Sequence, residues 1–216
     1  MLRKTCHLFA LCMLLSLMTQ AQMPVTGMSG FNAKDYKKKL GLKAGVNFAN
    51  VNASSNLDLK GRSGFMVGAF FAPATRSGFG FRTELIYSSQ GFAYNANNTE
   101  SKVAQNYIYL PQLTTYTIGK VLQLQAGMQL GFLLNAKKDN GTSQDVKSYY
   151  NHLDYGFAGG VEINPLKFLI VGSRYNVSLG NIYNSGPPTS ASPFPFDPNT
   201  LKGKNSVLQF YVGCKL

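Results

Sequence analysis

The clearest pattern in the chain is an alternation of apolar and polar residues between Val121 and Leu134. The even positions from Leu122 to Leu134 are all apolar, whereas the odd positions carry mainly glutamine and glycine. In a helix these glutamines would point in every direction, but in a β-strand they share one face. The pattern therefore predicts a strand with one apolar face and one polar face.

The same alternation predicts eight strands along the chain. They cover residues 40–48, 64–72, 79–89, 106–118, 121–134, 152–163, 166–179 and 208–216. The segment 106–118 contains Pro111 and alternates poorly, so its facing stays open. Most of these segments are longer than the usual strand, and they approach the roughly 9–11 residues of a tilted membrane-spanning strand.

Short and long connections alternate between the predicted strands. The short ones are Pro73–Gly78, Gly119–Lys120 and Asn164–Pro165, and the long polar ones are Asn50–Gly61, Gln90–Gln105, Asn135–Asn151 and Gly180–Asn205. Such alternation is typical of barrels with turns in the periplasm and loops outside the cell. The predicted fold class is all-β, an eight-stranded antiparallel up-and-down transmembrane β-barrel.

We expect the apolar faces to meet lipid and the polar faces to fill the barrel interior. The polar faces carry mostly Gly, Gln, Asn and Ser, with few of the long charged side chains of a water-exposed sheet. Bulky apolar side chains from every strand would overfill so narrow an interior, whereas in lipid they need no partner. A soluble exported ligand-binding barrel, with the faces reversed, is the competing hypothesis.

The amino-terminal segment has the features of an export signal. A positively charged start is followed by the apolar run Leu8–Met18 and by small residues around Ala21. We predict a signal peptide over residues 1–21, a flexible periplasmic leader over 22–38 and an outer-membrane barrel domain over 39–216. The barrel domain would contain one cysteine, Cys214, so it could form no internal disulfide.

The net charge is positive, with 21 Lys and Arg against 9 Asp and Glu. The basic residues are spread along the chain and form no basic helix, so the pattern does not favour nucleic acid as a partner. Phosphate-rich lipid headgroups fit an exported protein better. We therefore predict outer-membrane lipid as a partner and expect no cofactor.

Charged residues on the predicted inward faces nearly balance. They are Lys43, Arg82, Arg174 and Lys215 on the basic side, and Glu84, Asp154 and Glu162 on the acidic side. An unpaired charge in a low-dielectric interior costs several kcal/mol, so we predict that these seven residues form an interior charge network. Arg174 and Asp154 are expected to pair, because a short turn joins their strands.

His152 is the one histidine that follows the predicted signal peptide, and Asp154 comes two residues later. A histidine beside a carboxylate at a barrel rim can serve catalysis. No signature serine or second acidic residue completes such a site, and His152 with Cys214 is not a metal site. We predict that the protein is not an enzyme. The proline-rich stretch Pro187–Pro198 is interpreted as an exposed loop, with contact to a partner as the alternative.

Several segments together resemble a known family. They are Gly41–Phe48, Glu84–Gln90, Tyr107–Pro111, Gln125–Leu134 and Gly172–Asn176. These motifs are similar to those of the PorT-like outer-membrane β-barrel family of Bacteroidota. The resemblance implies an integral outer-membrane barrel but no shared activity.

PorT itself is linked to a secretion system that exports proteins to the cell surface. By analogy, the resemblance suggests a structural, interaction or secretion-associated role at the cell envelope. Envelope or secretion proteins would then bind through the outer loops. A small passive pore or solute-binding barrel is the alternative function.

Overall fold

The structure is a computed structural model that describes residues 38–53, 59–73, 78–96, 99–119, 121–139, 141–184, 194 and 203–216. The predicted signal peptide, and the predicted leader apart from Lys38, lie outside the described residues. In the described part of the chain, no helix has the length and apolarity needed to cross a membrane.

The described residues form nine β-strands and one short 3-10 helix. These elements are β1 (Lys38–Ala53), β2 (Leu59–Pro73), β3 (Gly78–Ala96), β4 (Thr99–Ile118), β5 (Leu122–Asp139), β6 (Ser143–Asp145), η2 (Lys147–Tyr149), β7 (Leu153–Ile163), β8 (Leu169–Ser178) and β9 (Gly203–Lys215).

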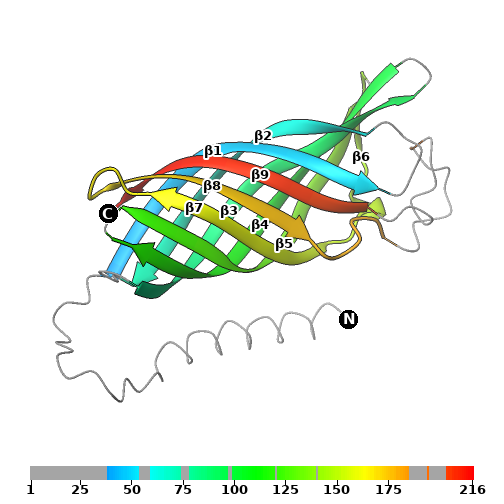
Figure 1. Cartoon of the computed structure of the whole chain (residues 1–216). Coiled ribbons are helices and arrows are strands. Elements are labelled where there is room, and N and C mark those ends of the chain that lie inside the picture. Colours follow the sequence, from blue (N-terminus) through cyan, green and yellow to red (C-terminus); the bar gives the residue numbers. More distant parts are fainter. Residues whose placement is uncertain are drawn as a thin grey trace. The chain divides into compact units, whose positions relative to one another are not determined.

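Eight of the strands close into an antiparallel ring, which Figure 1 shows from the side. The order around the ring is β1-β2-β3-β4-β5-β7-β8-β9, and β9 pairs with β1 over the full length from Gly203 to Lys215. The short strand β6 pairs with the last residues of β5. Every strand of the ring is thus paired on both sides, as hydrocarbon surroundings require. The predicted eight-stranded barrel is confirmed.

The barrel has two distinct ends. The connections β2–β3, β4–β5 and β7–β8 lie at the same end as the start of β1 and the end of β9, and we call this the turn end. The other four connections lie at the opposite end, which we call the loop end.

The two faces of the strands are sorted as predicted. On β5, Met128 is 64% exposed, whereas Gln125 and Gln129 are 4% and 5% exposed. Apolar residues cover the outer surface all around the ring, including Leu42, Phe48, Phe65, Leu85, Phe157, Tyr175 and Val212. Soluble proteins rarely expose an apolar surface on this scale. The arrangement excludes the soluble barrel with reversed faces.

Strand β4 settles the facing that the sequence left open. Its odd positions from Ser101 to Thr117 are buried and point inward, and its even positions are partly or fully exposed. Pro111 lies on the inward face. The β3–β4 ladder is interrupted beside Pro111: it contains the pairs Thr83–Gln112 and Ile86–Tyr109 but no pair between these two. The interruption occurs because proline has no N–H to donate.

The loop end differs from the prediction. Residues 90–105 are not a long loop: β3 continues to Ala96 and β4 starts at Thr99, so these strands project further than their neighbours (Figure 1). Phe92 and Val103 in this extension point inward and are fully buried. Its outward positions combine the polar Asn95, Lys102 and Asn106 with Ala93 and Ala104, so they lack the bulky apolar residues that mark a lipid-facing strand. The sequence of this extension therefore predicted a polar loop.

Strand β5 is also longer than predicted. Tyr107 pairs with Leu133 and Asn106 pairs with Asn135, so Leu134 is an extra residue in the ladder. A bulge of this kind reverses which positions point inward. Ala136 and Lys138 consequently face the interior, although the alternation before Leu134 places even positions outward.

Candidate functional site in the barrel interior

The interior near the turn end is filled by five charged side chains that touch one another. Arg174 donates from Nη1 and Nη2 to the two carboxylate oxygens of Glu84, at 2.6 and 3.0 Å. Lys43 Nζ donates to Glu84 Oε2 at 2.6 Å. Arg82 makes a second bidentate pair with Glu162, at 2.6 and 3.0 Å. We call these five residues the charge cluster.

The two ion pairs are joined into one network. Arg82 Nη1 lies 3.8 Å from Glu84 Oε1, which links the Glu162 pair to the Glu84 pair. The side chains of Lys43, Glu84 and Arg174 are 0% exposed. Because bidentate guanidinium–carboxylate bonds are strong and directional, the network holds strands β1, β3, β7 and β8 at fixed distances.

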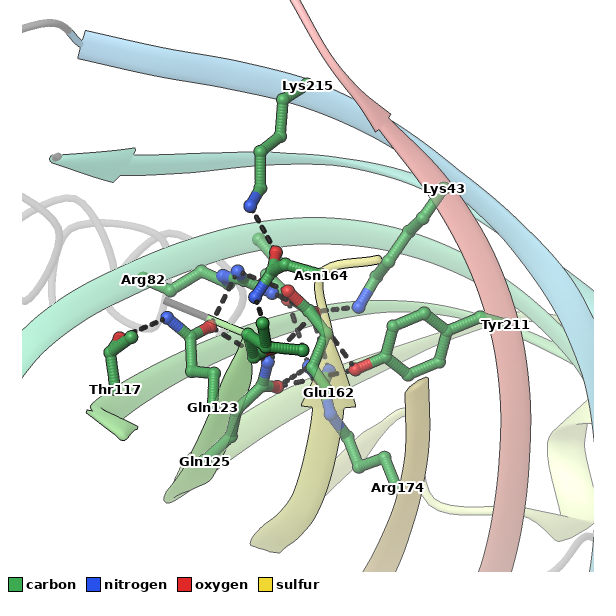
Figure 2. Close-up of polar contacts among 12 residues, drawn as sticks. Lys43, Arg82, Thr117, Gln123, Gln125, Glu162, Asn164, Arg174, Tyr211 and Lys215 are labelled. Carbon is green, nitrogen blue, oxygen red and sulfur yellow. Dashed lines mark hydrogen bonds and ion pairs between the residues drawn. The ribbon is translucent and has the colours of Figure 1, made fainter. Parts of the chain in front are cut away.

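Neutral side chains complete the network, as Figure 2 shows. Gln125 accepts a bond from Arg174 Nη2 at 2.6 Å and donates to Glu162 Oε2 at 3.0 Å. Gln123 Oε1 accepts from Arg82 Nη2 at 2.8 Å. The Lys43 ammonium lies 4.4 Å from the centroid of the Tyr211 ring, a cation–π contact. The inward glutamines of β5 therefore serve as bridges between buried ions.

The predicted pairing of Arg174 with Asp154 is wrong. It would require a tight turn centred on Asn164, but the β7–β8 connection spans residues 164–168 and sets Ile163 opposite Val171. Arg174 consequently lies opposite Gly160 and reaches across the interior to Glu84 instead.

Two of the seven predicted residues lie outside the charge cluster. Asp154 accepts hydrogen bonds from Tyr109 Oη and Ser178 Oγ, both at 2.8 Å, near the loop end. Lys215 donates to Asn164 Oδ1 near the turn end (Figure 2). The structure thus brings together Lys43, Arg82, Glu84, Glu162 and Arg174.

Aromatic rings close the interior at the loop end, and the sequence analysis did not find them. The stacked rings of Tyr107 and Tyr109 have centroids 5.4 Å apart, as do those of Tyr150 and Tyr183. Further members of this aromatic cluster are Phe92, Tyr94, Tyr149 and Phe194. Tyr150 and Tyr183 lie outside the membrane-spanning strands. Both hydroxyl groups are buried, and this burial raises their pKa.

Inward glycines make room for two of the interior rings. Tyr109 lies over Gly131 on the neighbouring strand, and a Cβ added to Gly131 would come within 2.3 Å of that ring. Tyr211 lies over Gly172 in the same way, at 2.5 Å. These two pairs explain part of the glycine found on the predicted inward faces, because each of the two rings occupies the space that a side chain would fill.

His152 and Asp154 do not form a catalytic pair. His152 is exposed, whereas Asp154 is 5% exposed and its carboxylate is bonded to Tyr109 and Ser178. Cys214 is exposed on the outer face. Among the described residues, no group of His, Cys, Asp and Glu could hold a metal ion.

The closed ring, the apolar outer surface and the charged, filled interior define an integral β-barrel of the outer membrane. The sequence model of the family described as outer membrane protein beta-barrel domain matches residues 21–184. The chain belongs to this family, and the protein is located in the outer membrane. No curated protein sequence matches the chain.

Two solved structures are similar to the chain. Neisserial surface protein A has a TM-score of 0.55 and 15% identity, over 82% of this chain and 97% of that protein. Ail, the attachment invasion locus protein of Yersinia pestis, has a TM-score of 0.49 and 12% identity, over 83% and 99%. At such identities, the likeness to Neisserial surface protein A concerns the fold alone.

Proposed function

We propose that the protein is a non-conducting barrel with a structural, interaction or secretion-associated role at the cell envelope. The observation that carries this proposal is the charge cluster, in which Arg174 and Glu84 join non-neighbouring strands with side chains that are 0% exposed. A barrel of eight strands has room for little more than its own side chains. A filled interior of this kind supports display or scaffolding rather than transport.

The loop end supports a role in binding a partner. Strands β3, β4 and β5 have 19, 20 and 18 residues, whereas β7 and β8 have 11 and 10. The longer strands exceed what a membrane span needs and form a rigid projection. Its exposed residues include Lys102 and Lys137, and the exposed Lys60 lies on the neighbouring strand β2. We propose that envelope or secretion proteins bind this projection and the outer loops.

The resemblance to the PorT-like family of Bacteroidota supports the secretion-associated form of this role by analogy. The contrast between the exposed His152 and the buried Asp154 supports a protein that is not an enzyme. Enzymatic activity would be tested with the purified protein against ester and acyl-lipid substrates. Turnover that is lost in the His152→Ala variant would contradict this part of the proposal.

Conductance in planar bilayers tests the filled interior. We expect wild-type protein to show no steady conductance steps. We expect the double variant Arg82→Ala and Glu162→Ala to conduct, because it removes one ion pair without leaving a lone charge. The control is the outward variant Phe157→Leu, which leaves the interior unchanged. Steady conductance of the wild-type protein would contradict the proposal.

Crosslinking from intact membranes tests the partner role. The triple variant Lys60→Glu, Lys102→Glu and Lys137→Glu changes exposed residues of the projection and of the neighbouring strand β2, and it leaves the aromatic cluster in place. We expect this variant to lose crosslinks that the wild-type protein forms. A variant with three outward substitutions at the turn end, Phe79→Leu, Tyr116→Leu and Ile118→Leu, should retain them. An equal set of crosslinks in both variants would count against the projection as the binding surface.

Solute binding at the loop end is a second candidate function. Gln105 is completely buried, and neither atom of its amide bonds to another of the described residues. Tyr150 Oη is likewise buried without a hydrogen-bond partner in the described part of the chain. Such groups fit a small hydrogen-bonding solute that enters between the rings. Calorimetric titration with monosaccharides, compared between wild type and Gln105→Leu, tests this function, and no heat of binding would exclude these solutes.

A further inference from the structure

The outer surface of β5, β7 and β8 contains a hollow near the middle of these strands. It has a volume of about 350 Å³ and is lined by Ala126, Gly127, Met128, Phe157, Ala158, Gly159, Tyr175 and Val177. Ala126 pairs with Gly159, and Gly159 pairs with Tyr175, so these three residues form one row across the three strands. We call this feature the outer hollow.

The barrel itself does not require the glycine at the floor of the hollow. A Cβ added to Gly159 would come no nearer than 3.9 Å to any other atom, which is ordinary contact. By contrast, a Cβ at Gly160 would lie 2.4 Å from the Ser173 carbonyl oxygen. Glycine within a strand weakens it and often marks close approach of another group. Here the space in front of Gly159 lies outside the protein.

The side chains around the outer hollow are apolar and exposed. Met128, Phe157 and Tyr175 are 64%, 51% and 50% exposed. Met128, Phe157 and Val177 form the next row across the strands towards the loop end. The thioether of Met128 adapts to irregular shapes, and the two rings offer flat apolar faces. A flexible hydrocarbon chain matches such a lining.

We infer that the outer hollow binds one acyl chain of an outer-membrane lipid. This inference depends on the membrane location and is independent of the proposed cellular role. The hollow lies on a face that meets hydrocarbon, where the available ligands are lipid chains. A stable protein–protein interface buries upwards of about 1,000 Å². The outer hollow is a local depression eight residues in extent, so a single chain fits it better than a second barrel.

Photocrosslinking tests the inference. The full chain would be reconstituted with a phospholipid that carries a diazirine within one acyl chain, and labelled residues would be mapped by mass spectrometry. We expect several-fold more label at Met128 and Phe157 than at Val67 and Leu85, apolar residues on other strands that are 50% and 52% exposed. Even labelling around the barrel would overturn the inference.

Filling the hollow provides the matched comparison. Gly159→Leu should reduce the label at Phe157 several-fold, because the leucine side chain would occupy the site of the acyl chain. Ala69→Leu likewise places a leucine on the outward face of β2 and should leave the label unchanged. If the Gly159→Leu variant does not insert into the membrane, Ala126→Leu provides a second variant that fills the floor of the outer hollow. Unchanged labelling in the filled variant, or crosslinks between two copies at this site, would overturn the inference.

Discussion

Arg174 on β8 and Glu84 on β3 meet across the barrel interior through two hydrogen bonds of 2.6 and 3.0 Å. Three strands of the ring, β2, β1 and β9, separate the two residues along one side. The pair therefore joins two strands whose backbones do not pair with each other. The interior cannot widen at this level without exposing or separating buried charges.

Breaking this pair on one side should be costly. Arg174→Met removes two charge-assisted bonds and leaves Glu84 with Lys43 at 2.6 Å and Arg82 at 3.8 Å. We expect the free energy of unfolding to fall by about 3–5 kcal/mol, the range for breaking a buried ion pair by removing one partner. The measurement is denaturant unfolding in lipid vesicles. Glu84→Met should cost less in the Arg174→Met background than in the wild-type protein, because Arg174 no longer loses its carboxylate, and strictly additive effects would contradict the pairing.

Asp154 should be far less sensitive than Glu84. Its carboxylate accepts bonds from two neutral hydroxyl groups, those of Tyr109 and Ser178. An asparagine oxygen can accept the same bonds, so Asp154→Asn should cost about 1 kcal/mol or less. Glu84→Gln leaves Lys43 and Arg174 without their carboxylate and should cost several times more. Equal losses in the two variants, measured by the same unfolding experiment, would refute this difference.

A charge on the lipid-facing surface should also be costly. Leu130 lies near the middle of β5 on the outward face. Leu130→Arg should lower the free energy of unfolding in a bilayer by about 2–4 kcal/mol, because the guanidinium would enter hydrocarbon. Gln144→Arg on the exposed strand β6 is the control and should change it little. A neutral result for Leu130→Arg would contradict its position in the membrane.

Two glycines should respond in opposite ways to the same substitution. At Gly131 a methyl group would collide with the Tyr109 ring, so Gly131→Ala should cost about 1–3 kcal/mol as an overpacked site. At Gly159 the methyl group meets open space, so Gly159→Ala should be neutral or slightly stabilising. Unfolding of both variants in vesicles checks this contrast. A similar loss in both would show that ring packing is not the reason for glycine at position 131.

Much of the fold could be predicted from the sequence because a strand's facing depends on the strand alone. The alternation of Leu122, Leu124 and Met128 with glutamines already assigns one face to lipid. The extension of β3 and β4 could not be read in this way. Beyond the lipid, water lies outside and aromatic rings lie inside, so the polarity of the two faces no longer follows the membrane pattern. The bulge at Leu134 also reverses which positions of β5 point inward.

The sequence by itself determined the eight strands within the membrane, the inward and outward residues of all of them but β4, and the charged character of the interior. Which inward residues meet was decided only by the tertiary structure. Strands in a closed barrel are tilted and staggered, so contacts across the interior depend on the accumulated register of all eight. For that reason Arg174 bonds to Glu84, 90 positions away, while Asp154 on the adjacent strand bonds to Tyr109 and Ser178.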